Sequence, residues 1–154
     1  MPILRIRDHE CSASDDLTPE NPARNVLAVE DNDITLQFLD QAMQRIGFAV
    51  NKANNGCEAW ELFSRKHFDL IITDYQMPLM DGLSLIKRVR AITPLIPIIL
   101  ISGKEREEIG RLNTIPHINA FLPKPFNIQA LNDTVKRICP IIGARISVNR
   151  SSIG

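Results

Sequence analysis

The sequence predicts an α/β fold in which a parallel sheet of five strands is covered by helices on both faces. Short runs rich in Ile, Val and Leu alternate with helical patterns along most of the 154 residues. Each strand-like run is apolar almost throughout, as in strands buried on both faces of a sheet. Strict alternation of strands and helices with right-handed crossovers gives an open, doubly wound sheet.

The first strand–helix unit begins with the apolar run NVLAVE, which predicts a buried strand over Asn25–Glu30. Asp33 then opens a pattern of apolar residues at helical spacing, and Gly47 ends it because glycine favours the left-handed backbone that closes a helix. The apolar positions of this helix are Ile34, Phe38, Leu39, Ala42, Met43 and Ile46.

The second unit begins at the next apolar run, FAVNKA, which predicts a strand over Phe48–Ala53. The pair Asn55-Gly56 is typical of a turn. A helix is expected over Glu58–Lys66, where apolar residues gather on one face.

The third unit contains the run DLIITD, which predicts a strand over Asp69–Asp74. Pro78 interrupts the chain after this strand, and Gly82 precedes the next helix. That helix has Leu85, Ile86 and Val89 on one side.

The last two units show the same order. The run IPIILIS predicts a strand over Ile96–Ser102, and a charged helix is expected over Lys104–Leu112. The run INAFLPK predicts a strand over Ile118–Lys124. The final helix is expected over Asn127–Cys139, with an apolar stripe along one face.

The chain divides into one domain with a short segment at each end. Residues 1–23 are polar, acidic and rich in proline, and we expect a flexible leader there. Residues 24–139 hold all five units and form the expected domain. Residues 140–154 are too few for a second domain and are expected to form a short tail.

Composition excludes several classes of protein. Equal numbers of acidic and basic residues give a formal net charge of zero, which argues against nucleic-acid binding. No apolar run approaches the ~18 residues of a membrane span. The three cysteines form no close pair and are expected to be reduced thiols. We therefore expect a cytoplasmic protein without membrane or nucleic-acid partners.

Polar side chains gather where the predicted strands end. Glu30 and Asp31 follow the first strand, Asp74 the third, Ser102 the fourth and Lys124 the fifth. In doubly wound folds ligands bind beyond these carboxyl ends. Two carboxylates ~4 Å apart repel by about 4 kcal/mol at an effective dielectric of ~20, and Mg²⁺ would offset that repulsion.

Such a cluster is suited to phosphoryl transfer. A metal and an ammonium neutralise the equatorial oxygens of a phosphoryl group, and a hydroxyl donates to one of them. A carboxylate can then attack phosphorus and become an acyl phosphate. We expect Asp74 to be this nucleophile, with Lys124 and Ser102 as its catalytic partners.

Four motifs together resemble the receiver domains of two-component response regulators. They are the pair Glu30-Asp31, DYQMPLMDG from Asp74, LISG from Leu100 and LPKPF from Leu122. The resemblance covers residues 24 to 139 and implies a flavodoxin-like fold with strand order 2-1-3-4-5. It implies a stand-alone receiver in a two-component or phosphorelay pathway, which catalyses its own phosphorylation and dephosphorylation rather than turning over a substrate.

The resemblance also assigns a role to each site residue. Asp74 would be the phosphorylated residue, and Mg²⁺ would bind Glu30, Asp31, Asp74 and the carbonyl of Gln76. Lys124 would contact the phosphoryl group, positioned by a cis peptide bond to Pro125.

The resemblance further implies a switch made of Ser102 and Phe121. After phosphorylation Ser102 would move toward the phosphoryl oxygens and Phe121 would turn inward. A downstream protein target would read the surface made by the fourth helix, the fifth strand and the fifth helix. The phosphodonor would be a histidine kinase or a histidine phosphotransfer protein, and homodimerisation is an open alternative.

Simpler explanations exist for single residues. Glu30 and Asp31 could be charges favoured at a helix N-terminus. Asp81 is expected to cap the next helix, Phe121 could belong to the core, and Ser102 could serve close packing. Two other functions also stay open, a metal-dependent phosphohydrolase and an interaction module with a vestigial acidic site. A phosphohydrolase of this kind needs an acid two residues after the nucleophile to protonate the leaving group, and this chain has Gln76 there.

Overall fold

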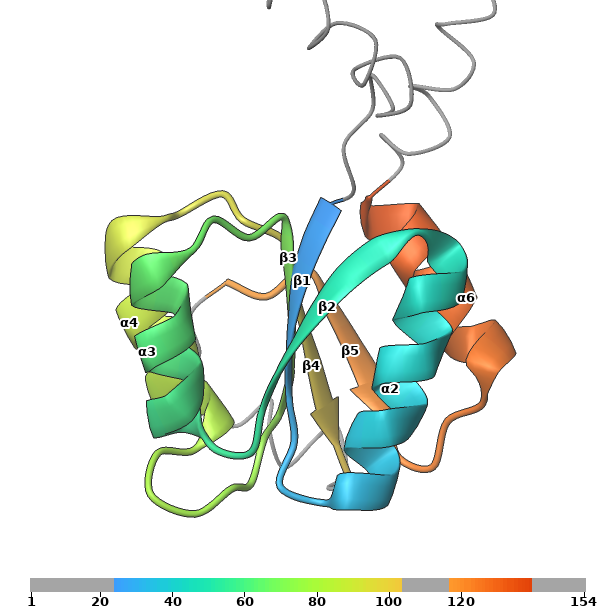
Figure 1. The fold of residues 1–154 in the computed structure, drawn as a ribbon, viewed down its shortest axis with the longest axis horizontal. Coiled ribbons are helices and arrows are strands. Elements are labelled where there is room, and N and C mark those ends of the chain that lie inside the picture. The colour runs from blue at the N-terminus through green and yellow to red at the C-terminus, as the bar shows by residue number, and fades with distance from the viewer. Residues whose placement is uncertain (1–23, 104–116, 140–154) are drawn as a thin grey trace, which may run out of the picture.

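The computed structural model describes residues 24–103 and 117–139, which form a five-stranded parallel sheet between helices (Figure 1). The strand order β2-β1-β3-β4-β5 confirms the predicted order 2-1-3-4-5. The strands are β1 (Arg24–Val29), β2 (Phe48–Ala53), β3 (Leu70–Asp74), β4 (Ile98–Ser102) and β5 (Ala120–Pro123). The helices are α2 (Asp33–Ile46), α3 (Gly56–Arg65), α4 (Gly82–Ile92) and α6 (Ile128–Ile138).

The sheet has a hydrophobic core on each face. Helices α2 and α6 cover one face, and α3 and α4 cover the other (Figure 1). Neighbouring residues of β3 point to opposite cores, Ile72 to the α2–α6 side and Ile71 to the α3–α4 side. Because both faces are buried, the central strands β3 and β4 are apolar at consecutive positions rather than at alternate ones.

The strand register brings the carboxyl ends of the central strands to one edge of the sheet. Val29 of β1 lies opposite Thr73 of β3, and Asp74 lies opposite Ile101 of β4. The polar residues that follow these strands are therefore neighbours in space, as the sequence predicts.

Two strands begin two residues later than predicted. β4 begins at Ile98 rather than at Ile96, because the intervening Pro97 has no N–H to donate to a neighbouring strand. β5 begins at Ala120 rather than at Ile118. Just before it, the side-chain oxygen of Asn119 accepts a hydrogen bond from the Ile98 N–H (2.9 Å) and takes the place of a main-chain partner.

Helix α3 begins earlier than predicted. The sequence pattern placed a turn at Asn55-Gly56 and the helix start at Glu58, but Gly56 is already helical. Asn55 is the N-cap, because its side chain accepts a hydrogen bond from the Glu58 N–H (2.8 Å). Glycine disfavours helices by intrinsic propensity, so only the cap reveals the true start.

Several predicted segments lie outside the described residues. They are the charged helix over 104–112, the leader over 1–23 and the tail over 140–154. Among the helices of the described part, none has the length and apolar character that crossing a membrane requires.

Gly47 offers a test of the end of α2. Its φ is 112°, and its N–H donates to the carbonyls of Met43 and Gln44. An added Cβ would meet no atom within 4 Å, so Gly47→Ala introduces backbone strain without a steric clash. We expect this change to lower the free energy of unfolding by about 1–2 kcal/mol. Urea denaturation measures it, and unchanged stability would contradict the assigned backbone.

Candidate functional site

The structure gathers the predicted site residues at one edge of the sheet. Glu30 follows β1, Asp74 and Ser102 end β3 and β4, and Lys124 follows β5. Glu30 is 1% exposed, Asp74 6% and Ser102 2%, whereas Asp31 is exposed. The cluster therefore consists of buried polar groups with one side open to solvent through Asp31.

Lys124 is the positive centre of the cluster. Its Nζ lies 3.0 and 3.2 Å from the two carboxylate oxygens of Glu30 and 3.2 Å from Oδ1 of Asp74. Its main-chain N–H donates to the carbonyl of Ser102 (2.8 Å), which fixes the backbone beside β4. The peptide bond to Pro125 is cis, as the family resemblance implies.

Burial and charge both affect the ionisation of the cluster. Burial, together with the nearby charge of Asp74, raises the pKa of Glu30. Burial also raises the pKa of Asp74, and the charge of Asp31 adds to this effect. Burial disfavours the Lys124 ammonium, but its contacts with Glu30 and Asp74 outweigh burial and leave its pKa raised.

The carboxylates could hold a divalent cation. One oxygen each from Glu30, Asp31 and Asp74 lie within 4.8 Å of one another. Opposite ligands of an octahedral Mg²⁺ are about 4.2 Å apart, so small movements would bring these oxygens into range. Three carboxylates face one ammonium, which leaves two negative charges unbalanced. A hard, doubly charged ion that prefers oxygen ligands fits this set.

The loop after Asp74, residues 75–81, is held by main-chain hydrogen bonds. The N–H of Tyr75 donates to the carbonyl of Ile101 (2.8 Å), and the N–H of Gly82 donates to the carbonyl of Tyr75 (2.8 Å). Gln76 is exposed in this loop, and its carbonyl stays a predicted metal ligand.

The same loop contains a strained turn. Leu79 has a φ of 70°, and the Met80 N–H donates to the carbonyl of Pro78 (2.7 Å). This is the pattern of a γ-turn with positive φ at its centre, which is rare for a residue with a side chain. Such a conformation costs roughly 1–3 kcal/mol and persists only where surrounding contacts enforce it.

The two predicted switch residues lie on neighbouring strands, β4 and the edge strand β5. Ser102 ends β4, directly after Ile101, the register partner of Asp74. Phe121 of β5 is half-buried and packs against the core on the α3–α4 face. These positions suit a switch, and they also suit ordinary packing, so the switch stays a prediction.

Some expectations for other polar residues are confirmed, and one residue was missed. Asp81 caps α4, because its side chain accepts a hydrogen bond from the Ser84 N–H (2.8 Å). Asn32 was not predicted to matter, yet its N–H donates to Glu30 (3.3 Å) and its side chain caps α2. The available signal was an asparagine directly before the helix start at Asp33.

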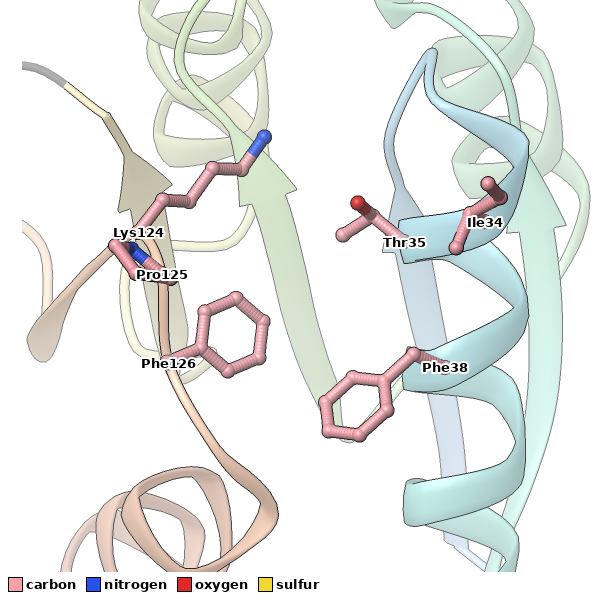
Figure 2. Close-up of a pocket in the computed structure, with 6 residues that line it drawn as sticks. All are labelled: Ile34, Thr35, Phe38, Lys124, Pro125 and Phe126. Carbon is pink, nitrogen blue, oxygen red and sulfur yellow. The ribbon is translucent and has the colours of Figure 1, made fainter.

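A groove adjoins the cluster on the side of α2. It has a volume of about 550 Å³ and lies between the start of α2 and the segment after β5 (Figure 2). The rings of Phe38 and Phe126 approach each other across its floor, 5.7 Å between centroids. Ile34 on its rim is 80% exposed. The lining residues are Ile34, Thr35, Phe38, Lys124, Pro125 and Phe126.

Comparisons with known proteins agree on one family. The response regulator receiver domain family matches residues 26–136. The response regulator receiver protein CpdR of Brucella abortus is 32% identical over 115 residues, 75% of this chain and 95% of CpdR. The autoinducer 1 sensor kinase/phosphatase LuxN of Vibrio campbellii is 31% identical over 126 residues. That match covers 81% of this chain but only 15% of LuxN.

Solved structures show the same fold. The Vibrio cholerae chemotaxis protein CheY4 is 30% identical with a TM-score of 0.71, covering 75% of this chain and 98% of CheY4. The receiver domain of a Pseudomonas aeruginosa sensor histidine kinase is 25% identical with a TM-score of 0.69. That match covers 75% of this chain and 96% of the other, which holds a magnesium ion in its active-site cleft.

The unbalanced negative charge of the cluster predicts stabilisation by Mg²⁺. At about 100 times its dissociation constant a ligand adds about 2.7 kcal/mol to stability, so we expect Mg²⁺ to raise the melting temperature. Asp31→Asn should lose most of this shift, since Asp31 supplies one of the three carboxylates. Asp133→Asn, an exposed change on α6, should keep it. Differential scanning fluorimetry measures both, and a full shift in Asp31→Asn would contradict the metal assignment.

Proposed function

The chain belongs to the response regulator receiver domain family, and we propose that Asp74 is the residue that accepts the phosphoryl group. Members of this family are phosphoacceptors in two-component signalling, and this chain is a receiver of that kind. The observation that carries the assignment to Asp74 is its place: a buried carboxylate ending the central strand, 3.2 Å from Lys124 and beside Glu30 and Asp31.

The reaction proposed for Asp74 balances as a simple displacement. A carboxylate oxygen of Asp74 forms a bond to phosphorus, the bond from phosphorus to the donor's histidine nitrogen breaks, and the imidazole leaves with that electron pair. Lys124 neutralises charge on the phosphoryl oxygens from its position between Glu30 and Asp74. The product is an acyl phosphate whose hydrolysis resets the domain, so the protein acts on itself rather than turning over a substrate.

Mg²⁺ is the proposed cofactor, and it would supply charge neutralisation beside the attacked phosphorus. Glu30, Asp31 and Asp74 would hold it with the carbonyl of Gln76. The spacing and charge of the carboxylates support this assignment. The magnesium ion in the Pseudomonas aeruginosa receiver supports it by analogy.

The signal to a downstream protein would follow from the charge that phosphorylation adds to Asp74. A phosphoryl group brings roughly 1.5 to 2 negative charges and three acceptor oxygens. Ser102, buried at the end of the adjacent strand, is the proposed hydroxyl that moves toward it. Phe121 would follow, and the face containing β5 and α6 would change for a downstream protein target. The helix predicted over 104–112, which would be the third part of that face, lies outside the described residues.

A histidine kinase or histidine phosphotransfer protein is the proposed donor, since sensor kinases are among the relatives. Such a protein must place its phosphohistidine next to Asp74 and would then cover the adjoining groove. Lys124 lines that groove and also contacts Asp74 (Figure 2). The exposed apolar side chain of Ile34 offers contact area there.

The first test concerns the acceptor. We expect phosphoramidate, a small donor with a phosphorus–nitrogen bond, to label the wild-type chain with one phosphoryl group in the presence of Mg²⁺. Asp74→Asn should remove the labelling, because a neutral amide is a poor nucleophile toward phosphorus. Intact-protein mass spectrometry measures it, with Asp133→Asn as the matched control. Undiminished labelling of Asp74→Asn would refute the assignment.

The second test separates docking from chemistry. Ile34→Glu should slow transfer from a phosphorylated histidine phosphotransfer protein by about tenfold, since burying an unpaired charge at a contact costs more than 1.4 kcal/mol. Transfer from phosphoramidate should not change.

The matched control for docking is Leu95→Glu. Leu95 is 88% exposed and precedes β4, at the opposite end of the sheet from the site. Rapid-quench measurements should show that this control accepts the phosphoryl group from both donors at the wild-type rate. If Ile34→Glu transfers from the protein donor at the wild-type rate, the groove is not the docking surface.

A further inference from the structure

The loop over residues 75–81 contacts helix α3 at Gly56. Gly56, the first residue of α3, is buried, and its N–H donates to the carbonyl of Met80 (3.1 Å). A Cβ added at Gly56 would lie against that carbonyl oxygen and 2.7 Å from the Cβ of Met80. No side chain fits here, so the first turn of α3 and the loop meet backbone to backbone.

A second glycine holds the other side of this loop. A Cβ added at Gly82 would lie against the carbonyl oxygen of Asp74 and 3.1 Å from Cα of Tyr75. The loop is thus held at three places: at Tyr75 by β4, at Met80 by α3 and at Gly82 by its own start. The strained turn at Leu79 lies between the first two of these contacts, directly before Met80.

We propose that Gly56 is a positioning residue for the Mg²⁺ site, because it fixes the loop that carries Gln76 close to Asp74. The inference rests on the proposed function, in which that loop supplies a metal ligand. Mg²⁺ demands near-ideal octahedral geometry, so small displacements of one ligand weaken binding. A strained residue such as Leu79 keeps its conformation only while its surroundings enforce it. Loosening the contact at Met80 therefore lets the loop relax away from the site.

The start of α3 is well suited to act as a fixed support. The side chain of Asn55 accepts a hydrogen bond from the Glu58 N–H (2.8 Å), and the carboxylate of Glu58 accepts one from the Asn54 N–H. This pair is similar to a capping box, except that Glu58 accepts from the residue before the N-cap, and it satisfies two donors at the first turn. Gly56 thereby has a defined position against Met80.

The experiment measures Mg²⁺ affinity in the whole chain by calorimetry, with the fluorescence of Trp60, the only tryptophan, as a second readout. Gly56→Ala should raise the dissociation constant by about tenfold, the usual effect of losing a residue that orients a metal ligand. Gly47→Ala is the matched control: the same substitution strains a helix end far from the loop. It should lower stability and leave the dissociation constant unchanged.

A second set of variants avoids the steric clash, in case Gly56→Ala does not fold. Asn55→Ala removes the cap and should weaken Mg²⁺ binding by a smaller factor. Asn55→Ser keeps a capping oxygen and should restore it. Circular dichroism confirms that each variant is folded before titration.

The outcomes distinguish a failure of the role proposed for Gly56 from a failure of the proposed function on which it rests. If the wild-type chain binds no Mg²⁺, or Asp31→Asn binds it as well as wild type, the metal assignment itself fails. If those controls behave as expected but folded Gly56→Ala and Asn55→Ala bind Mg²⁺ like wild type, only the role of Gly56 is refuted. An equal loss in Gly47→Ala would also refute it, since the effect would then reflect general instability.

Discussion

The ion pairs of Lys124 with Glu30 and Asp74 are the contacts on which the site depends. Burial alone would favour neutral forms of all three groups, and mutual contact reverses this for the lysine. One ammonium cannot balance three carboxylates, so the cluster keeps a net negative charge that a divalent cation would neutralise. The energy of this imbalance would favour the binding of positive charge at the site.

The sheet makes this concentration of charge possible. The central strands β3 and β4 are buried over their whole length, so polar groups of these strands lie near solvent only where the strands end. The register places the ends of β1, β3 and β4 side by side, with β3 in the centre. Asp74 is therefore buried at the end of the central strand, next to the exposed Asp31.

Much of this arrangement could be predicted because it follows from residue type and strand order. Continuous apolar runs identified the strands, and the polar residues after them identified the site, since parallel strands share one carboxyl edge. Boundaries failed where side chains replaced main-chain groups, as at Asn119 and Asn55. Contacts between loops, such as that of Gly56 with Met80, depend on packing between distant segments and leave only a glycine as a signal.

That limit explains why the supporting residues were missed while the charged ones were found. The chemistry of a carboxylate or a lysine can be inferred from its residue type at any position. Asn32 and Gly56 matter through local contacts instead: Asn32 caps α2 and donates its N–H to Glu30, and the N–H of Gly56 donates to Met80. Asn32 directly precedes α2 and Gly56 begins α3, and each contacts a residue of the site or of the loop after Asp74. In a fold that places its ligands at strand ends, the helix starts that follow are the nearest rigid elements. Caps and glycines at those positions therefore set the precision of the site, whereas the charged side chains set its chemistry.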